Sequence, residues 1–350
     1  MGLLPDVGID TLLQDLKSVN ALSKQRVGIV TNKCTLTKDR IPSAYALYDK
    51  IGDALKCILT PEHGWNGVIA EGVKIKDEVD GKTGLPVFSL YEGAVKPFDF
   101  LKVPPLDILI IDLQDVGLRC YTYAATCAKF LEKYEGDVIV CDRPNPLGPQ
   151  RQGPTLDPAY RSLLAYLDVP FQHGETMGGL LSSFKRKLPF QVVECNPYHR
   201  PYAYPWHPPS PNLPSWQSVL LYPALVMLEG ANISEGRGTS LPFTSLGAPD
   251  LDHKGLADFL NQLPYDGVVA HPITFIPKRS KWKGKKCNGV QLVLEECATF
   301  NAFSYGTDLL RFLRQHYKAF EWLPLSKGRF FIDALMGTTS FRQEVEEMTS

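Results

Sequence analysis

A carboxylic acid and an imidazole stand side by side in the segment PEHG at residues 61–64, and Trp65 follows directly. Proline and glycine favour a tight turn, which would present Glu62 beside the apolar wall of Trp65. Such a wall raises the pKa of a carboxylic acid, which is what a general acid needs to donate a proton near neutral pH. Glu62 is therefore a candidate catalytic acid, and the equally weighted alternative is a turn carboxylate bonded to backbone amides. His63 either binds the substrate or holds the loop.

Residues 114–123 (QDVGLRCYTY) combine a carboxylate, an amide, a guanidinium group and phenols around a glycine turn. Arg119 in this segment and Arg143 in the segment 142–146 (DRPNP) are candidate binders of a carboxylate or phosphate, because a guanidinium group meets such anions with two parallel hydrogen bonds. An internal ion pair between Asp115 and one of these arginines is the structural alternative. The remaining candidate binding residues are Gln114, Tyr121, Asn145 and Asp142, the last interpreted mainly as an organiser of its loop.

Two further polar segments occur in the second half of the chain, PSPN at residues 209–212 and SEGRGT at residues 234–239. Ser210 and Asn212 are the candidate substrate contacts of the first. In the second, the glycines on either side of Arg237 allow the backbone to approach a ligand, so the loop is predicted to present Glu235 and Arg237. A structural pair between this glutamate and this arginine is the alternative.

One short run, residues 278–286 (KRSKWKGKK), is strongly basic and is the one candidate nucleic-acid patch. The whole chain, however, has 37 Lys and Arg against 38 Asp and Glu, with a formal net charge of −1. A short basic run in a neutral protein is usually a solvated loop. We therefore expect no nucleic-acid partner.

The elements that must position these side chains are short β-branched apolar runs in the first half of the chain. Continuous apolarity is typical of strands covered on both faces, and helix-like stretches at residues 43–56 and 121–134 suit crossover connections. The sequence thus predicts an α/β fold with a parallel sheet and flanking helices. The predicted strands are residues 26–31, 57–60, 87–90, 106–112 and 137–141.

Polar residues follow directly after each predicted strand. In open α/β sheets, ligands bind outside the carboxyl ends of the strands, where successive loops converge on one crevice. One cleft is therefore expected to collect the candidate residues of the first half, which are Asn32, Glu62, Tyr91, Gln114, Asp115, Asp142, Arg143 and Asn145.

The composition changes after a further predicted strand at residues 190–195. Residues 196–216 hold seven prolines, which excludes a helix or a central strand there. We place the domain boundary in this connection, with residues 1–205 as the larger domain and 206–350 as a smaller α/β (α+β) domain. In the second region the sequence predicts strands at residues 268–276, 290–294 and 330–335 and helices at residues 223–229 and 307–316.

Familiar cofactor motifs do not occur. No G-x-G-x-x-G follows the first predicted strand, Gly81-Lys82-Thr83 lacks the earlier glycine of a P-loop, and there is no G-x-S-x-G. We therefore expect no cofactor and no metal. The eight cysteines contain no C-x-x-C pair and are interpreted as reduced core residues. With no apolar run of roughly 20 residues and no signal peptide at its start, the chain is expected in the cytoplasm and off the membrane, or exported if a leader is missing.

The segments PEHGWNG, QDVGLRCYTY, DRPNPLG, HGETMG, PSPN and EGANISEGRGT, in this order, resemble the exo-β-N-acetylmuramidase family, formerly a domain-of-unknown-function family. The resemblance implies a bacterial cell-wall recycling glycoside hydrolase that releases terminal N-acetylmuramic acid from the non-reducing end of peptidoglycan fragments. It also implies a Rossmann-like domain paired with a smaller α/β domain, with the muramyl saccharide bound in the cleft between them.

Carried over to the matching positions, the resemblance implies that Glu62 is the catalytic carboxylate that protonates the leaving oxygen, with His63 beside it. The group that stabilises the developing positive charge stays open between Asp115, Glu235, Asp142 and the acetamido oxygen of the substrate. Muramic acid carries a lactyl carboxylate, for which the natural partners are Arg119, Arg143 and Arg237.

One departure from the family pattern leaves two other functions open. The family usually has a glutamate where this chain has Gly179, and Glu175 is the candidate substitute. If the missing carboxylate was catalytic, the chain is a catalytically silent muramyl-saccharide-binding protein. The other alternative is a metal-dependent hydrolase with His63, Asp115 and Asp142 as ligands, for which the spacing signal is weak.

Overall fold

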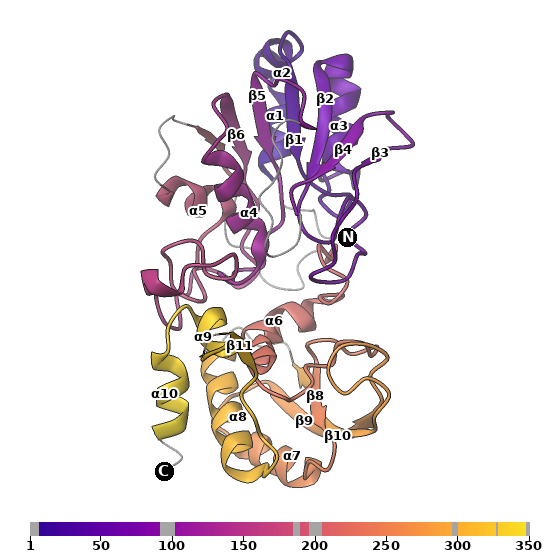
Figure 1. The fold of residues 1–350 in the computed structure, drawn as a ribbon. Helices are drawn as coiled ribbons and strands as arrows, with labels where there is room; N and C mark the ends of the chain where they lie inside the picture. The colour runs from indigo at the N-terminus through magenta and orange to yellow at the C-terminus, as the bar shows by residue number, and fades with distance from the viewer. Residues whose placement is uncertain are drawn as a thin grey trace. The chain divides into compact units, whose positions relative to one another are not determined.

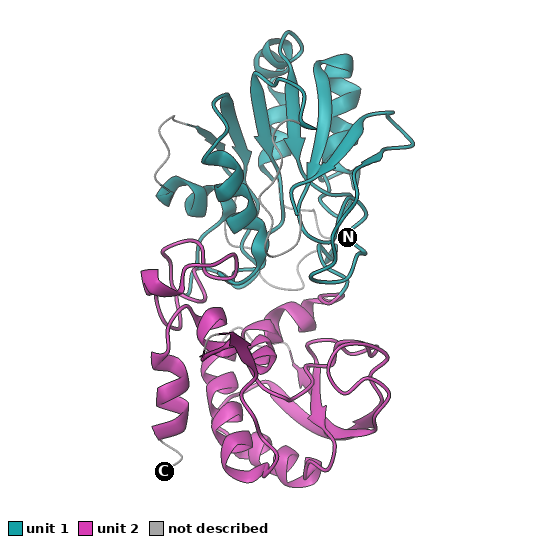
Figure 2. Cartoon of the chain, in the orientation of Figure 1, with its two compact units in different colours: residues 1–150, 174–211 teal, residues 151–173, 212–350 magenta. Residues whose placement is uncertain are grey.

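The computed structural model describes residues 7–91, 102–184, 190–195, 205–295, 300–326 and 328–347. The chain divides into two compact units (Figure 2): residues 1–150 and 174–211 form unit 1, and residues 151–173 and 212–350 form unit 2. The sequence suggested a single division between residues 205 and 206. The contacts instead divide the units after residue 211 and assign the excursion 151–173 to unit 2.

Unit 1 is built on a seven-stranded sheet with the order β3-β4-β2-β1-β5-β6-β7 (Figure 1). All neighbouring strands are parallel except the short pair β3 and β4, so the predicted parallel sheet is confirmed. The strands are β1 (Val27–Val30), β2 (Leu55–Thr60), β3 (Glu78–Val79), β4 (Pro86–Ser89), β5 (Ile108–Ile111), β6 (Asp137–Cys141) and β7 (Gln191–Val193).

The helices of unit 1 cover both faces of this sheet. Helix α3 connects β1 to β2, and α4 connects β5 to β6, so the two crossovers run outward in opposite directions. Right-handed crossovers that run in opposite directions place their helices on opposite faces, which explains why every residue of β1 is buried. The helices are α1 (Gly8–Gln14), α2 (Leu16–Leu22), α3 (Ser43–Ile51), α4 (Thr122–Leu131) and α5 (Met177–Ser183).

The same topology marks a place for a ligand. Because the chain leaves β1 toward β2 on one side and leaves β5 toward β6 on the other, the strand order reverses between β1 and β5. Loops that diverge at such a point leave a crevice at the carboxyl ends of the strands, where open α/β sheets bind their ligands. The loops after β1 and β5 are therefore the expected walls of a site.

Unit 2 contains a three-stranded antiparallel sheet with the order β8-β10-β9 and a two-stranded sheet of β11 and β12. The strands are β8 (Ser245–Ala248), β9 (Val268–Phe275), β10 (Cys287–Leu294), β11 (Pro324–Ser326) and β12 (Arg329–Phe330). The helices are α6 (Trp216–Leu225), α7 (His253–Gln262), α8 (Ala302–His316), α9 (Phe331–Met336) and α10 (Ser340–Glu347).

Two predicted elements of unit 2 differ from the structure. The strand predicted at residues 330–335 is wrong, because α9 covers most of it and ends at Gly337, which adopts a left-handed φ of 64°. A short apolar run does not distinguish a strand from a buried helical turn. The helix predicted from residue 223 begins earlier, where the Ser215 hydroxyl caps α6, and Pro223 lies inside that helix.

Candidate active site

Glu62 lies in the turn after β2 and is 9% exposed. Its Oε1 accepts a hydrogen bond from the backbone N–H of Gly72 at 2.9 Å, and its Oε2 accepts one from Oγ1 of Thr122 at 2.7 Å. The Tyr91 side chain also hydrogen-bonds to Glu62, and burial, together with this carboxylate, raises the pKa of Tyr91. Donors from the loops after β2, β4 and β5 thus meet at one carboxyl group, which bonds both a backbone amide and side-chain hydroxyls.

The hydroxyl partners of Glu62 suit proton transfer. A hydroxyl group can donate to a carboxylate or accept from a carboxylic acid, whereas a backbone N–H can only donate. Thr122 and Tyr91 can therefore remain bonded to Glu62 in both of its protonation states. Such partners suit a general acid that later acts as a base, because its proton leaves and returns within one catalytic cycle.

Tyr123 fixes the segment beside Thr122. Its hydroxyl donates to the carbonyl oxygen of Pro209 at 2.6 Å and accepts from Nδ2 of Asn32 at 3.3 Å. The ring of Tyr121 packs against it with centroids 4.5 Å apart. Asn32 and Tyr121 therefore lie with Tyr123 in one buried layer next to the partner of Glu62.

His63 and Trp65 serve the turn and the core. The Nδ1 atom of His63 lies 2.8 Å from the carbonyl oxygen of Ile69, and since a carbonyl only accepts, Nδ1 carries the proton. His63 therefore holds the loop, at a φ of 73°. The indole N–H of Trp65 donates to Asp80 at 2.9 Å, and its ring packs edge-on against Tyr45 in the hydrophobic core.

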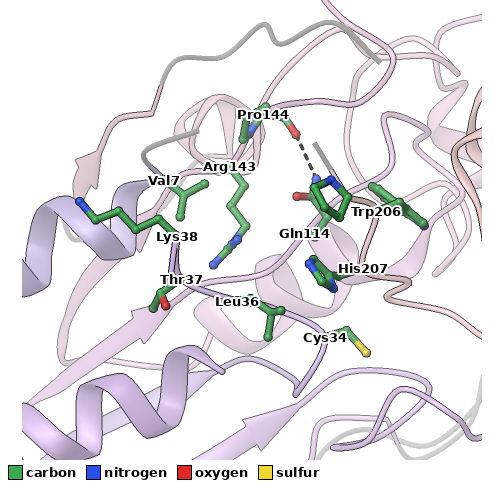
Figure 3. A pocket seen from close by; sticks show the side chains of 11 residues that line it. Val7, Cys34, Leu36, Thr37, Lys38, Gln114, Arg143, Pro144, Trp206 and His207 are labelled. Carbon is green, nitrogen blue, oxygen red and sulfur yellow. Dashed lines mark hydrogen bonds between the residues drawn. The ribbon is translucent and has the colours of Figure 1, made fainter. Parts of the chain in front are cut away.

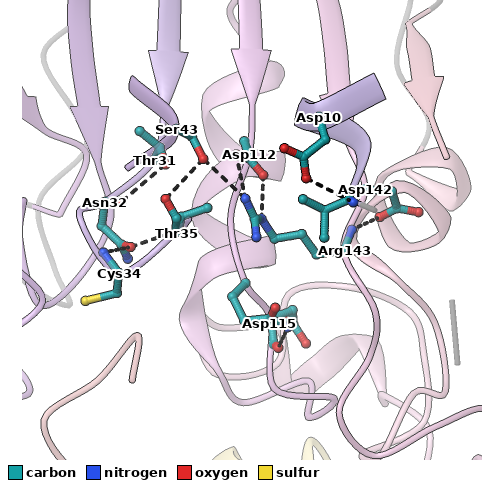
Figure 4. A network of polar contacts seen from close by, with 12 residues as sticks. Asp10, Thr31, Asn32, Cys34, Thr35, Ser43, Asp112, Asp115, Asp142 and Arg143 are labelled. Atoms are coloured by element: carbon teal, nitrogen blue, oxygen red, sulfur yellow. Dashed lines mark hydrogen bonds and ion pairs between the residues drawn. The ribbon is translucent and has the colours of Figure 1, made fainter. Parts of the chain in front are cut away.

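Arg143 forms a buried ion pair with Asp112 (Figure 4). Its Nε donates to Oδ1 at 2.6 Å and its Nη2 to Oδ2 at 2.9 Å, and Nη2 also donates to the hydroxyl of Ser43 at 3.2 Å. The sequence predicted that Asp115 could pair with an arginine. For Arg143, the partner is Asp112 instead. The bidentate edge of this guanidinium group, which the sequence assigned to a ligand, belongs to the protein.

Asp142 organises its loop, as the sequence indicated. Its Oδ1 accepts from the N–H groups of Gly178 at 2.9 Å and Arg143 at 3.2 Å, and its Oδ2 accepts from the hydroxyl of Thr176 at 2.5 Å. Burial raises the pKa of Asp142. These bonds tie the loop after β6 to the start of α5.

The neighbouring polar side chains also brace loops. Gln114 Nε2 donates to the carbonyl oxygen of Pro144 at 3.0 Å, and Asp115 Oδ1 accepts from the N–H of Gly117 at 2.6 Å. Asn145 Nδ2 donates to the carbonyl oxygen of Glu175 at 2.9 Å. Arg119 in the same region is 4% exposed.

Glu175 occupies the space that a side chain at position 179 would need. A Cβ atom built on Gly179 would lie 2.6 Å from Oε2 of Glu175. A glutamate at position 179 and the observed position of Glu175 therefore exclude one another. The carboxylate of Glu175 therefore lies beside position 179, where the family pattern has a glutamate.

Glu235 belongs to a chain of ion pairs within unit 2. It is fully buried between Nζ of Lys281, 2.7 Å from Oε2, and Nη1 of Arg237, 3.3 Å from Oε1, and Arg237 also pairs with Glu229 at 2.5 Å. Burial raises the pKa of Glu229, whereas for Glu235 the two cations outweigh burial and lower the pKa. The structural Glu–Arg pair is therefore present, and both oxygens of Glu235 face protein cations.

The basic run is anchored to the same part of unit 2. Lys281 Nζ donates to the carbonyl oxygens of Leu228 at 2.6 Å and Ala231 at 3.0 Å, and the Trp282 indole donates to Asn232 at 2.6 Å. Arg279 Nη2 donates to Oδ1 of Asn212 at 2.8 Å. Ser210, the other residue of PSPN named as a candidate, lies in unit 1 and is 3% exposed.

The described residues contain no group of three His, Cys, Asp or Glu side chains placed to hold a metal ion, so His63, Asp115 and Asp142 do not converge as ligands. Within the same residues, no helix has the length and apolarity to cross a membrane. The seven described cysteines are thiols rather than disulfides, and Cys297 lies outside the described residues.

The sequence missed the residues that hold the candidates in place. Thr122 stands inside a quoted segment, yet only the strand-end geometry shows that its hydroxyl reaches Glu62. Asp112 is the last residue of a predicted strand and is fully buried, so a carboxylate at the end of an apolar run was the available signal. For Ser43 the sequence gives no signal beyond its place at a helix start.

Comparisons with known proteins cover nearly the whole chain. Residues 27–217 match the family described as "Exo-beta-N-acetylmuramidase NamZ, N-terminal", and residues 220–350 match its C-terminal counterpart. The chain is 37% identical to the peptidoglycan beta-N-acetylmuramidase NamZ of Bacillus subtilis (strain 168) over 98% of this chain and 84% of that protein.

Two solved structures share the fold. A DUF1343 family protein from Bacteroides fragilis superposes with a TM-score of 0.81 at 24% identity, over 99% of this chain and 93% of that one. A second DUF1343 family protein of that organism gives a TM-score of 0.70 at 28% identity, over 98% and 91% of the two chains. The predicted fold class is confirmed.

Proposed function

The chain belongs to the exo-beta-N-acetylmuramidase NamZ family, and we propose that it is a glycoside hydrolase that releases terminal N-acetylmuramic acid from the non-reducing end of peptidoglycan fragments. The observation that carries the proposal for this chain is the carboxyl group of Glu62, held at the end of β2 by hydroxyls from two other strand-end loops. The substrate is a muramyl saccharide.

In the proposed reaction, Glu62 gives its proton to the glycosidic oxygen as the bond from that oxygen to the anomeric carbon breaks. The sugar then carries positive charge, water adds to the anomeric carbon, and Glu62 takes the proton that the water loses. Thr122 and Tyr91 donate to the carboxylate that Glu62 becomes once its proton has left. The reaction consumes one water molecule for each glycosidic bond that it breaks.

We assign the second role, stabilisation of the positive charge, to the acetamido oxygen of the substrate. Asp142 and Glu235 both have their two oxygens engaged by protein donors or cations, and Asp115 uses one oxygen on Gly117. Substrate-assisted glycosidases use the acetamido oxygen in this way. A substrate with an N-trifluoroacetyl group, whose oxygen is a weaker nucleophile, is expected to react more slowly, and an equal rate would contradict the assignment.

The direct test is to incubate the protein with a muramyl-containing disaccharide and with its glucosamine-only counterpart and to measure free sugar by mass spectrometry. Release of N-acetylmuramic acid from the first is expected. Tight binding of the muramyl sugar without turnover would instead support the silent binding protein, for which the specific observation is Gly179 in place of the family's glutamate.

Thr122→Val is expected to lower kcat by about tenfold to a hundredfold with little change in KM, because it removes a hydrogen bond to a group that is charged in part of the cycle. The measurement is steady-state kinetics on a chromogenic muramide. Thr126→Val is the matched control, since Thr126 is also buried in α4, one turn further on. Equal kcat values for the two variants would remove Thr122 from the mechanism.

A further inference from the structure

A cavity of about 50 Å³ opens in unit 1 at the point where the strand order reverses (Figure 3). Its walls come from the loops after β1, β5 and β6 and from residues 205–207, and they include Leu36, Thr37, Gln114, Arg143, Trp206 and His207. This volume has room for about four water-sized groups, which is the size of a small substituent rather than a whole sugar.

Arg143 gives the cavity a fixed positive edge. Asp112 and Ser43 bind its Nε and Nη2 atoms, and no bond joins Nη1 to another of the residues that the structure describes. Figure 3 shows the side chain directed into the cavity. Because the ion pair immobilises the guanidinium group, the N–H groups of Nη1 are presented to a ligand at little cost in entropy.

His207 supplies a second polar group. Within the described part of the chain its Nε2 is buried and has no hydrogen-bond partner, which is costly unless a ligand or water satisfies it. Burial, with Arg40 and Arg143 nearby, lowers the pKa of His207 and so favours the neutral ring. Both charged groups that act on the ring are cations, and an anion is the ligand that this field favours.

The remaining lining limits the ligand to a small one with an apolar part. Val7, Leu36 and Pro144 present aliphatic surface to the cavity, and Trp206 adds an aromatic face. Phosphate would leave this surface in contact with charged oxygens, whereas a carboxylate on a short aliphatic chain satisfies both parts of the lining.

The cavity adjoins the turn that carries Glu62. Sγ of Cys34, in the cavity wall, lies 3.9 Å from the carbonyl oxygen of Asn66, and a Cβ on Gly67 would lie 2.6 Å from that sulfur. Asn32 joins the same wall to the Tyr123 layer, since it accepts from the Cys34 N–H at 3.1 Å and donates to the Tyr123 hydroxyl. Tyr123 follows Thr122, the partner of Glu62.

We propose that this cavity binds a small carboxylate on a short aliphatic group, with the carboxylate between Nη1 of Arg143 and Nε2 of His207. The substrate of the proposed reaction carries such a group, the lactyl substituent of muramic acid. This assignment rests on the proposed function. A free short-chain carboxylic acid has the same chemistry and is the other source. The cavity then determines which sugar is accepted.

The test uses His207→Phe, which removes the ring nitrogens, and Leu36→Phe, which narrows the cavity while keeping every polar group. His271→Phe is the matched control, because His271 is exposed on β9 in unit 2. The first readout is a titration with D-lactate, followed by calorimetry in every variant and, where His207 is present, by the NMR spectrum of the histidine ring nitrogens. The second is kcat/KM for an aryl β-N-acetylmuramide and for the matching β-N-acetylglucosaminide.

We expect D-lactate to shift the His207 resonances of the wild-type protein and both cavity variants to bind it at least about tenfold more weakly. Both are also expected to lose about tenfold or more in kcat/KM for the muramide relative to the glucosaminide, while the control keeps the wild-type ratio. Lactate binding with an unchanged ratio would overturn the lactyl assignment in favour of a free carboxylate. Absence of both effects would overturn the site, and lack of turnover on either substrate would contradict the proposed function while the titration still decides the cavity.

Discussion

Replacing Glu62 by glutamine is expected to lower kcat on a muramyl disaccharide by about two to four orders of magnitude, the usual contribution of a general acid. The amide keeps the shape of the side chain and can still bond to Thr122 and to the N–H of Gly72, so the fold has no reason to change. It has no proton to give to the glycosidic oxygen. The circular dichroism spectrum and the melting temperature are expected to remain those of the wild type.

A comparison of substrates with different leaving groups shows whether Glu62 is a general acid or a carboxylate that only supports the structure. A 4-nitrophenyl group departs without much help from a proton, whereas a sugar hydroxyl needs protonation as the bond breaks. Glu62→Gln is therefore expected to lose far more activity on the disaccharide than on the nitrophenyl muramide. Glu78→Gln is the control, since Glu78 is exposed on the edge strand of the same unit. Equal losses on both substrates would show that Glu62 positions the substrate and does not protonate it.

The sheet of unit 1 could be predicted because its strands are continuous apolar runs and the helices between them have the length of a crossover. The bounds of β6, Asp137–Cys141, agree with the predicted residues 137–141. The segment 330–335 was misassigned because six residues hold less than two helical turns, too few for the period to show. The pairing of β12 with β11, a tertiary feature, takes up the start of that segment, and the Gly337 cap sets the end of the helix.

The sequence predicts the candidate site only through the positions where the strands end. Polar residues after parallel strands indicate a crevice, which is how Glu62 and Tyr91 were found together, but they do not indicate which oxygen meets which donor. Arg143 bonds to Asp112 rather than Asp115 because the side chain of Arg143, after β6, crosses to the end of β5. His207 lies in the proline-rich connection. The composition of this segment excludes a helix or a central strand but does not predict where its side chains lie.

The buried pair of Asp112 and Arg143 leads to the largest expected effect on stability. Asp112 has no exposed surface and Arg143 is 7% exposed, so Asp112→Asn leaves a buried cation without its counter-charge. Removal of one partner of a buried pair costs about 3–5 kcal/mol. The free energy of unfolding, measured by urea titration followed by circular dichroism, is expected to fall by that amount. Asp107→Asn is the control, because Asp107 forms a comparable pair with Arg26 at the surface and should change stability little.

The double variant Asp112→Leu with Arg143→Met distinguishes charge balance from a need for this particular pair. Burying two charges costs solvation that their attraction only partly returns, so apolar side chains of similar size are expected to restore most of the stability lost by Asp112→Asn. The same variant removes the guanidinium group from the cavity and should therefore fold while losing affinity for D-lactate. If it is as unstable as Asp112→Asn, charge balance alone does not account for the stability, and the hydrogen bonds of this particular pair support the fold.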